Sequence, residues 1–516
     1  MDARSGHIRM ADVLGSLSLV ADAGFGLPPE ESMRSCLIAT ALARRLGLSE
    51  SETSDVFYTA LLEHIGCTGT AHEAAAAYGD EMRLYAAAVV TDDTLRDELG
   101  TMLPKLLRGR PWMERLRILA FSLSRGSDFG RTFVAAVCEV GQSTARRLGL
   151  SEGVQRGVRD VFEGWNGKGG FQSFKGETVP IQSRVTRLAG IATRFNDIGG
   201  QDLAMAAVRR RSGGMLDPAM AALFVADAPA IFAEADAADP HQAILAAEPS
   251  PPTTLPASQL REVAAVFGDI ADLKSTYTLG HSGGVAELAR AAGRRLGLDG
   301  VTADRLEVAA LLHDIGRVGV SDEIWERSAP LTAAQWEQVR LHAYHAERIL
   351  ARSSALHLTA TIAGMHHERL DGSGYHRGST ARDVSVSARI LAAADAWQAM
   401  SQDRAHRAAL APADASERIR EEVDAGRLDG DAAAAVVEAA GRPRPRSTVP
   451  RPAGLSEREV EVLRAVAKGL SNREIGESFG ISPRTAEHHV EHVYDKIGVS
   501  SRAAAAVFAM EHGLID

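Results

Sequence analysis

LLHDIG, residues 311–316, ends an apolar helical pattern with a histidine and an aspartate side by side. A related stretch, LLEHIG, occupies residues 61–66, which is 250 positions earlier. At the same offset, GRRLGL at 293–298 matches ARRLGL at 43–48. Two matches at one offset predict two copies of one helical domain; chance similarity between Ala- and Leu-rich helices is the alternative.

Glycine-containing stretches extend the two copies. NGKGG (166–170), followed by VPIQSRV (179–185), resembles DGSGY (371–375), followed by VSVSARI (384–390). Here the offset is 205 positions, so the first copy holds about 45 extra residues (250 − 205) between its matching parts. The sequence therefore predicts a duplication with an insertion in the first copy.

The composition is that of an ordinary soluble globular protein, with 45% hydrophobic and 24% charged residues among 516. The net charge of −10 gives no global attraction to nucleic acid, so any DNA binding must be local. Three cysteines, Cys36, Cys67 and Cys138, form no C-x-x-C pair and fit a reducing cytoplasm. We see no signal peptide and no run of 18 apolar residues, so we expect a cytoplasmic protein without a membrane span.

Two proline-rich stretches, 248–256 and 441–452, are predicted to be linkers, because proline at this density favours extended spacers. They divide the chain into three predicted domains, 1–247, 257–440 and 453–516. No alternating strand pattern of useful length stands out, so we expect an all-α fold. The clearest predicted helices of the second copy are 284–296, 304–313, 333–351 and 357–368.

Histidine is concentrated in the second copy, where eight of the 17 lie between residues 281 and 376. Seven ligand-type residues lie in or at the ends of helical segments: His281, His313, Asp314, His342, His366, His367 and Asp395. Imidazole and carboxylate groups are costly to bury unless satisfied, and metal coordination satisfies them. Two metal ions about 3.5–4 Å apart can stabilise displacement at phosphorus, so the cluster predicts hydrolysis of a phosphate ester. His345, His357 and His376 are interpreted as ordinary core or surface residues.

These residues, with HHERLDGSGYHRG at 366–378 and ARILAAADAWQAM at 388–400, resemble the HD-GYP branch of the HD phosphohydrolase superfamily over roughly residues 270–410. The resemblance implies an all-helical fold, a di- or trinuclear metal centre and hydrolysis of cyclic di-GMP. The ions would be divalent transition metals, with Fe or Mn expected and Zn or Ni as alternatives.

The resemblance also implies roles for individual residues. Asp314 and Arg317 would carry the catalytic step. The implied metal ligands are the bridging Asp314; His281, His313 and Asp395 on one ion; and His342, His366 and His367 on the other. The implied substrate contacts are Arg317, Gly374, Tyr375 and Arg404.

The sequence departs from the family pattern at three positions. Arg317 replaces the usual lysine, and a planar guanidinium holds a phosphate differently from a point charge. His376 replaces the proline of the GYP motif, so the loop loses a fixed φ angle and the substrate becomes an open question. Tyr277 stands where trinuclear members carry a glutamate, which favours two metal ions.

The first copy lacks most of these ligands. The counterparts of His281, His313, Asp314, His366, His367 and Asp395 are Glu31, Glu63, His64, Val161, Phe162 and Gly190. Valine, phenylalanine and glycine side chains cannot bind metal. We therefore expect a degenerate HD-type domain with a role in structural support, dimerisation or ligand sensing.

Residues 453–516 predict four short helices. Ser456 with Glu459, and Ser471 with Glu474, fit capping boxes, and Ser482 precedes a proline at a helix start. The segment resembles a LuxR-type helix-turn-helix domain over nearly its whole length. By this resemblance, the residues facing double-stranded DNA are Arg484, Thr485, Glu487, His488 and Glu491, with Lys496 and Arg502 near phosphates. Residues 453–516 carry seven basic and ten acidic residues, so one copy should bind weakly and we expect a homodimer.

The leading hypothesis is a metal-dependent phosphodiesterase that acts on a cyclic dinucleotide, with cyclic di-GMP expected, coupled to a DNA-binding transcriptional output. One alternative is a regulator whose HD domain senses a nucleotide without hydrolysing it. Another is a phosphohydrolase for a different nucleotide, which Arg317 and His376 leave open.

Overall fold

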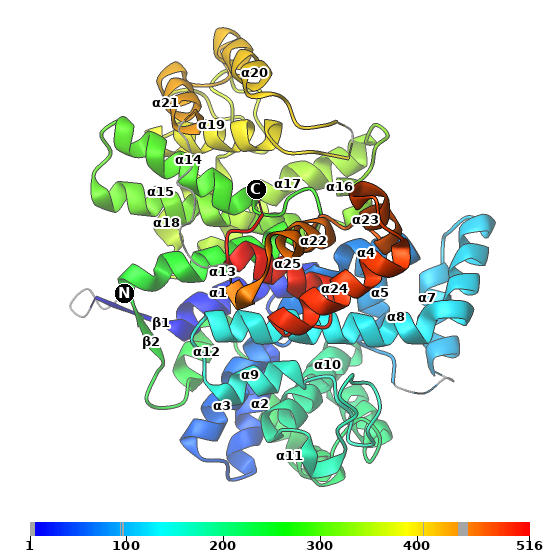
Figure 1. Cartoon of the computed structure of the whole chain (residues 1–516). Helices are drawn as coiled ribbons and strands as arrows, with labels where there is room; N and C mark the ends of the chain where they lie inside the picture. The colour runs from blue at the N-terminus through cyan, green and yellow to red at the C-terminus, as the bar shows by residue number, and fades with distance from the viewer. Residues whose placement is uncertain (1–5, 93, 95–96, 406, 442–451, 516) are drawn as a thin grey trace. The chain divides into compact units, whose positions relative to one another are not determined.

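The computed structural model describes residues 6–515 except 93, 95–96, 406 and 442–451 (Figure 1). Its contacts divide the chain into two compact units, Met1–Pro256 and Ala257–Asp516, which are described separately. Helices dominate both units, and the strands of the described residues form one two-stranded ribbon. The prediction of an all-α fold with tandem HD-type domains and a four-helix C-terminal module is confirmed.

Unit 1 contains the first copy and its insertion. Its helices are α1 Met10–Gly24, α2 Glu31–Arg45, α3 Glu50–Leu61, η1 Ile65–Thr70, α4 Ala71–Tyr78, α5 Glu81–Ala88, η2 Glu98–Met102, α7 Leu103–Leu107, α8 Trp112–Arg147, α9 Glu152–Arg159, η3 Gly176–Thr178, α10 Ile181–Arg211, α11 Pro218–Ala235 and α12 Pro240–Ala247. The insertion supplies α4 to the first half of α8, which pack an aromatic cluster over the HD-type helices. The long helix α8 is the cyan rod in Figure 1.

The stretch 248–256 is not the free spacer that its prolines predict. Strand β2 (Thr254–Pro256) pairs antiparallel with β1 (His7–Arg9), a ribbon too short to leave an alternating sequence pattern. Glu248 pairs with Arg9 and accepts a 2.6 Å hydrogen bond from the Tyr58 hydroxyl. These contacts dock the stretch on unit 1. The second predicted linker, 441–452, lies almost entirely outside the described residues.

Unit 2 contains the second copy and the C-terminal module. Its helices are η4 Ala257–Gln259, α13 Leu260–Asp272, α14 His281–Arg295, α15 Gly300–Leu312, η5 Ile315–Gly319, α16 Asp322–Trp325, α17 Ala333–Leu350, α18 His357–Gly364, α19 Val386–Met400, α20 Pro412–Asp424, α21 Gly430–Ala440, η6 Pro452–Gly454, α22 Glu457–Ala467, α23 Asn472–Phe479, α24 Pro483–Ile497 and α25 Arg502–Glu511. The four predicted helices of the second copy are present; the last ends at Gly364, before the histidine pair.

Matching hydrogen bonds relate the two copies. Asp272 accepts bonds from the backbone N–H and the hydroxyl of Ser282, and Asp22 accepts the same two bonds from Ser32, 250 positions earlier. In each copy this aspartate fixes the start of the helix that follows. Identical bonds at the predicted offset are not expected of unrelated helices.

A second match lies at the offset of 205. The Glu368 carboxylate accepts from the backbone N–H groups of Arg377 and Ser379. The Glu163 carboxylate accepts from those of Gln172 and Phe174, which are their exact counterparts in number. We call this arrangement the glutamate clasp; it holds the glycine-rich loop closed in both copies.

The C-terminal module folds around one apolar core. Both predicted capping boxes are present, at Ser456 with Glu459 and at Ser471 with Glu474. Helix α24 begins after the N-cap Ser482 and buries Val490 and Val493 in the core.

Helix α11 is long and apolar enough to cross a membrane by length and composition, with a window hydropathy of 1.3 over 18 residues. It packs on α2 and α10, contains Pro229 and carries Asp227, which pairs with Arg45. These contacts place α11 against two helices of unit 1, and a single helix of this kind is weak evidence for a span.

Candidate metal centre and DNA-binding face

Five helical elements of unit 2 bring the seven predicted ligands together. His281 is the first residue of α14, His313 caps α15, His342 lies in α17 and Asp395 lies in α19. His366 and His367 lie in the turn that follows α18. All seven are buried except His367, which is half-buried. The sequence places these residues up to 114 positions apart, and the fold makes them one cluster.

The ligand atoms form two groups. One contains His281, His313 and Asp314, and the other contains His342, His366 and His367; within each group the ligand atoms lie within 4.8 Å of one another. Each group offers three donors of the kinds that transition metals prefer.

Asp314 lies between the groups with one carboxylate oxygen toward each. Its Oδ1 is 3.3 Å from His342 Nε2 and 3.5 Å from His366 Nε2. Its Oδ2 is 3.6 Å from His313 Nε2 and 3.8 Å from His281 Nε2. This is the orientation required of a carboxylate that bridges two cations.

Asp395 also reaches both groups. Its Oδ1 lies 3.2 Å from His281 Nε2 and 3.8 Å from His313 Nε2, while its Oδ2 lies 3.7 Å from His367 Nδ1. The geometry therefore gives Asp395 a wider reach than the single ion that the sequence comparison assigned to it.

Three backbone carbonyls fix the orientation of the histidine rings. The Nδ1 atoms of His313, His342 and His366 lie 2.5–2.7 Å from the carbonyl oxygens three residues earlier in the chain. A carbonyl can only accept, so each Nδ1 carries the proton and each Nε2 presents a lone pair to the centre. A histidine that binds metal through one ring nitrogen typically donates from the other to such an acceptor.

The lone pairs of this centre require a cation. His342 Nε2 and His366 Nε2 face each other at 3.0 Å, although the carbonyls make both of them acceptors. His313 Nε2 and Asp314 Oδ1 are buried without a hydrogen-bond partner among the described residues. Unpaired buried acceptors are costly, so the donor set fits divalent metal ions.

The protonation states agree with this fit. Burial lowers the pKa of His366 to about 4, so the ring is neutral at pH 7. Burial alone would raise the pKa of Asp314, but the neighbouring Arg317 guanidinium holds it well below its ordinary value. Neutral imidazole and ionised carboxylate are the forms that bind metal.

Gln402 and Trp325 support the centre and were not singled out from the sequence. The Nδ1 of His281 lies 2.9 Å from Gln402 Oε1, which orients that ring as the carbonyls orient the others. The Arg317 guanidinium stacks on the Trp325 ring at 3.8 Å and lies 3.3 Å from Asp314. Arg317 is therefore held at the edge of the centre. Gln402 and Trp325 belong to no sequence motif that could have revealed these supporting roles.

The glycine-rich loop carries Tyr375 to the centre. The Tyr375 ring lies 4.3 Å from the His367 ring, and Arg340 donates to the carbonyl oxygen of Gly374. A Cβ on Gly374 would lie 2.6 Å from the Glu368 Cα, so only glycine fits there. The loop and the clasp together set the position of the tyrosine.

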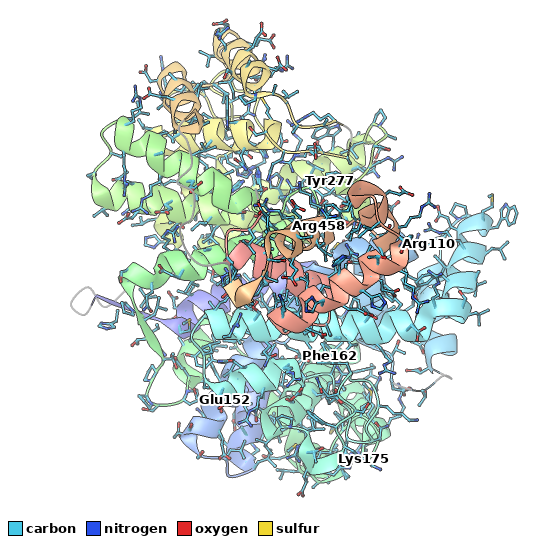
Figure 2. The ribbon with its side chains drawn as sticks, viewed as in Figure 1. Arg110, Glu152, Phe162, Lys175, Tyr277 and Arg458 are labelled. Carbon is cyan, nitrogen blue, oxygen red and sulfur yellow. The ribbon has the colours of Figure 1, made fainter. Side chains whose placement is uncertain are left out.

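Arg404 is half-buried beside the centre, and desolvation lowers its pKa to about 10. It donates a 3.2 Å hydrogen bond to the carbonyl oxygen of Tyr277, which Figure 2 labels. The Tyr277 backbone thus holds a guanidinium group beside the centre. His376 packs on Tyr344 and has no hydrogen-bond partner among the described residues.

The residues predicted to face DNA divide into two sets. Five are exposed on one side of α24: Arg484, Thr485, Glu487, His488 and Glu491. We call this set the predicted DNA-binding face. Lys496 instead pairs with Glu459 at 2.8 Å, and Arg502 donates to the carbonyl oxygens of Val466 and Leu470 at 2.7 Å. Both cations are engaged inside the module.

Comparisons with known proteins follow the same division of the chain. Residues 265–432 match the family model of the HD domain, and residues 453–509 match that of bacterial regulatory proteins of the luxR family. The chain is similar to 3'3'-cGAMP-specific phosphodiesterase 3 of Vibrio cholerae, with 32% identity over 80% of this chain and 90% of the relative. It is also 35% identical to a cyclic di-GMP phosphodiesterase of Thermotoga maritima, over 29% of this chain and 41% of the relative.

A solved structure has a similar fold. The crystal structure of V-cGAP3, described as a cyclic GMP-AMP specific phosphodiesterase of V. cholerae, gives a TM-score of 0.59 at 28% identity. The match covers 85% of this chain and 99% of the solved chain. The chain therefore belongs to the HD-GYP branch of the HD-domain phosphodiesterases and carries a LuxR-type helix-turn-helix domain.

Proposed function

We propose that the second copy hydrolyses one 3'–5' phosphodiester bond of a cyclic dinucleotide, with two divalent ions held by the seven predicted ligands. The observation that carries this proposal is the bridging position of Asp314 between two histidine groups. A domain that only senses a nucleotide would not need two complete donor sets.

The chain's own residues bind and orient the substrate in this proposal. When bound, the two ions would neutralise the phosphate charge and lower the pKa of a water molecule. Arg317, stacked on Trp325, would donate to a phosphate oxygen, and Tyr375 would offer its ring to a base. Arg404, half-buried beside the centre, would add a second positive charge.

The comparisons favour 3'3'-cGAMP as the first substrate to test and cyclic di-GMP as the second. The similarity to the 3'3'-cGAMP-specific relative extends over 80% of the chain, whereas the similarity to the cyclic di-GMP relative covers 29%. The ligand set of five histidines and two aspartates suits Fe or Mn, with Zn and Ni as alternatives.

Purified protein, incubated with each dinucleotide and followed by chromatography, tests this proposal. We expect about two metal ions per chain by elemental analysis and conversion of at least one dinucleotide to a linear product. Full metal content without turnover of either would indicate another nucleotide substrate. Metal-free protein that binds a dinucleotide and leaves it intact would establish the sensing alternative instead.

The predicted DNA-binding face supports a transcriptional output of the same chain. Its five side chains are exposed on α24, while the opposite side of that helix packs in the module core. Because residues 453–516 are net acidic, binding would need the two modules of a cytoplasmic homodimer. Arg484→Ala should weaken retardation of promoter fragments about tenfold, with Arg473→Ala as a control on α23. Wild-type protein that retards no fragment at low salt would contradict this output.

A further inference from the structure

Unit 1 encloses a cavity of about 680 Å³ at the place that corresponds to the metal centre. Its floor includes Glu31, Glu63, His64 and Gly190, the counterparts of four metal ligands in the second copy. The loss of the ligands has therefore left a space, and other groups now line it.

The roof of the cavity comes from the insertion. It is mainly apolar and aromatic, with Tyr78, Leu84, Tyr85, Met102, Leu119 and Phe133 among its residues. Phe25 stacks between His64 and Tyr85, with ring centroids 4.5 Å and 4.9 Å apart. Leu123 lines the space and is 82% exposed, so the cavity opens to solvent at α8. The additional residues of the first copy thus build an apolar chamber over a polar floor.

Two arginines of α10 replace the metal ions as the positive charge of this site. Arg187 and Arg194 line the cavity three residues before and four residues after Gly190, on the same face of the helix. At the offset of 205, the second copy has alanines at both positions, residues 392 and 399. Arg194 pairs with Glu31 at 2.9 Å, and Arg187 stacks over the Phe162 ring at 5.0 Å.

Glu63 gives the floor an unpartnered polar group. Its side chain is 5% exposed, fills the space above Gly190, and has no hydrogen bond from a described residue. The His64 ring is its neighbour, with Nε2 4.0 Å from the Glu63 carboxyl group, and burial lowers the pKa of His64 to about 3, so this ring is neutral. Burial raises the pKa of Glu63 to about 8, so the group is mostly a neutral hydrogen-bond donor at pH 7. The floor then presents donors and positive charge, as an anion requires.

We propose that this cavity binds an amphipathic organic acid, whose anionic head lies at Arg187 and Glu63 and whose apolar body lies under the insertion. A nucleotide base would fit the roof less well, because the donors and acceptors of a base need partners. The Tyr85 hydroxyl is already used by Thr70 and by the carbonyl oxygen of Cys67. A twelve-carbon chain has no such groups and fits within the volume.

Calorimetric titration of the full-length Asp314→Asn protein with dodecanoate tests the proposal, because this background disables the second copy. We expect one saturable site per chain. Arg187→Gln should weaken binding at least tenfold, since a charged hydrogen-bond partner is lost. Ala88→Trp, at an exposed lining position, should also weaken binding by filling the space. Arg209→Gln, exposed on the same helix, is the matched control and should bind as the parent does.

Two further probes test the charge of the head group and the possibility that the cavity binds a nucleotide. Dodecyltrimethylammonium has the same chain with the opposite charge and should not bind. Equal binding of both amphiphiles, or dodecanoate binding that neither Arg187→Gln nor Ala88→Trp weakens, would overturn the proposal. The proposal would also be overturned if the Asp314→Asn protein binds 3'3'-cGAMP, if Arg187→Gln weakens that binding, and if dodecanoate does not displace the dinucleotide.

Discussion

The two copies of the HD-type domain present the same helices around different centres. In unit 2, Asp314 lies between two groups of histidines whose lone pairs converge. In unit 1, the corresponding His64 stacks on Phe25, and Arg187 supplies charge to an open cavity. One fold therefore supports a metal centre when the interior carries donors, and a chamber when it carries apolar groups and arginine.

Comparison of the two copies also distinguishes the hydrogen bonds that maintain the fold from the side chains that could bind metal. The Asp–Ser bond at the helix start and the glutamate clasp are present in both copies. The ligands that they position are present in only one. Backbone-directed bonds have been retained where the side chains that face the centre have changed.

Substitution of Asp314 should produce the largest difference between the two copies. Asp314→Asn should lower kcat/KM by about 10³-fold or more and reduce the bound metal, because an amide cannot bridge two cations. His64→Asn, at the matching position of unit 1, should change turnover less than twofold. Steady-state kinetics with elemental analysis measure both. Equal losses in the two variants would mean that both copies take part in hydrolysis.

Glu63, at the floor of the cavity in unit 1, should make the stability of the protein depend on pH. The pKa of Glu63 is raised from 4.5 to about 8, so the folded state holds a proton that the unfolded state releases in this range. Stability should therefore fall as pH rises from 4.5 to 8, and Glu63→Gln should remove a cost on the order of 2–4 kcal/mol at pH 8.

Calorimetric unfolding at pH 5 and pH 8 checks this prediction. Glu63→Gln should unfold at a higher temperature than the parent at pH 8, with little difference at pH 5. Glu152→Gln is the control, since that residue is exposed at the start of α9 and is labelled in Figure 2. Glu31 and Asp22 also have raised pKa values, but both residues are present in the parent and in Glu63→Gln, so they do not account for a difference between the two proteins. A gain that is the same at both pH values would argue against a protonated Glu63.

Arg317 also distinguishes the two copies, because its counterpart is Cys67, which has no positive charge to bind a phosphate. Arg317→Ala should lower kcat/KM about 10- to 100-fold, mainly through KM, as expected for a lost charged hydrogen bond. Trp325→Leu should give a smaller loss in the same direction, because the guanidinium loses its stacking surface. A change in kcat alone would place Arg317 outside substrate binding.

The smallest expected effect is at Gln402, which orients His281. Gln402→Ala should weaken metal binding about tenfold, as is usual when a residue that orients a metal-binding histidine is lost. Its counterpart in unit 1, Asp197, pairs with Arg34 on the surface, and Asp197→Ala should leave metal content unchanged. Competition with a chelator, followed by elemental analysis, distinguishes the two variants.

The sequence predicted those parts of the molecule whose residues carry their own signature. The HD-type pattern marked the seven residues that the fold brings together, and the capping residues marked the starts of the helices that begin the C-terminal module. The offsets of 250 and 205 marked the duplication. The offset of 205 makes Val137 the counterpart of His342, and the contacts agree: Gly66 packs against the carbonyl oxygen of Val137, as Gly316 packs against that of His342.

The parts that could not be predicted depend on tertiary contacts. Gln402 and Trp325 have no motif, because each acts through one partner that the fold brings to it. The ribbon of β1 and β2 is three residues long in each strand and depends on pairing across the whole of unit 1. The insertion could be counted from the offsets, but only the fold reveals that it roofs a cavity.

The glutamate clasp makes the degenerate copy a scaffold for reconstruction. Since Glu163 still closes the loop through the same two backbone bonds as Glu368, the segments that once carried ligands keep their anchorage. Restoring donors at positions 31, 63, 64, 137, 161, 162 and 190 would therefore be a change of side chains on an existing frame. The loop backbone held by the clasp is thus the same in both copies, whereas the ligand-type side chains are present in only one. The two arrangements can be compared within a single chain.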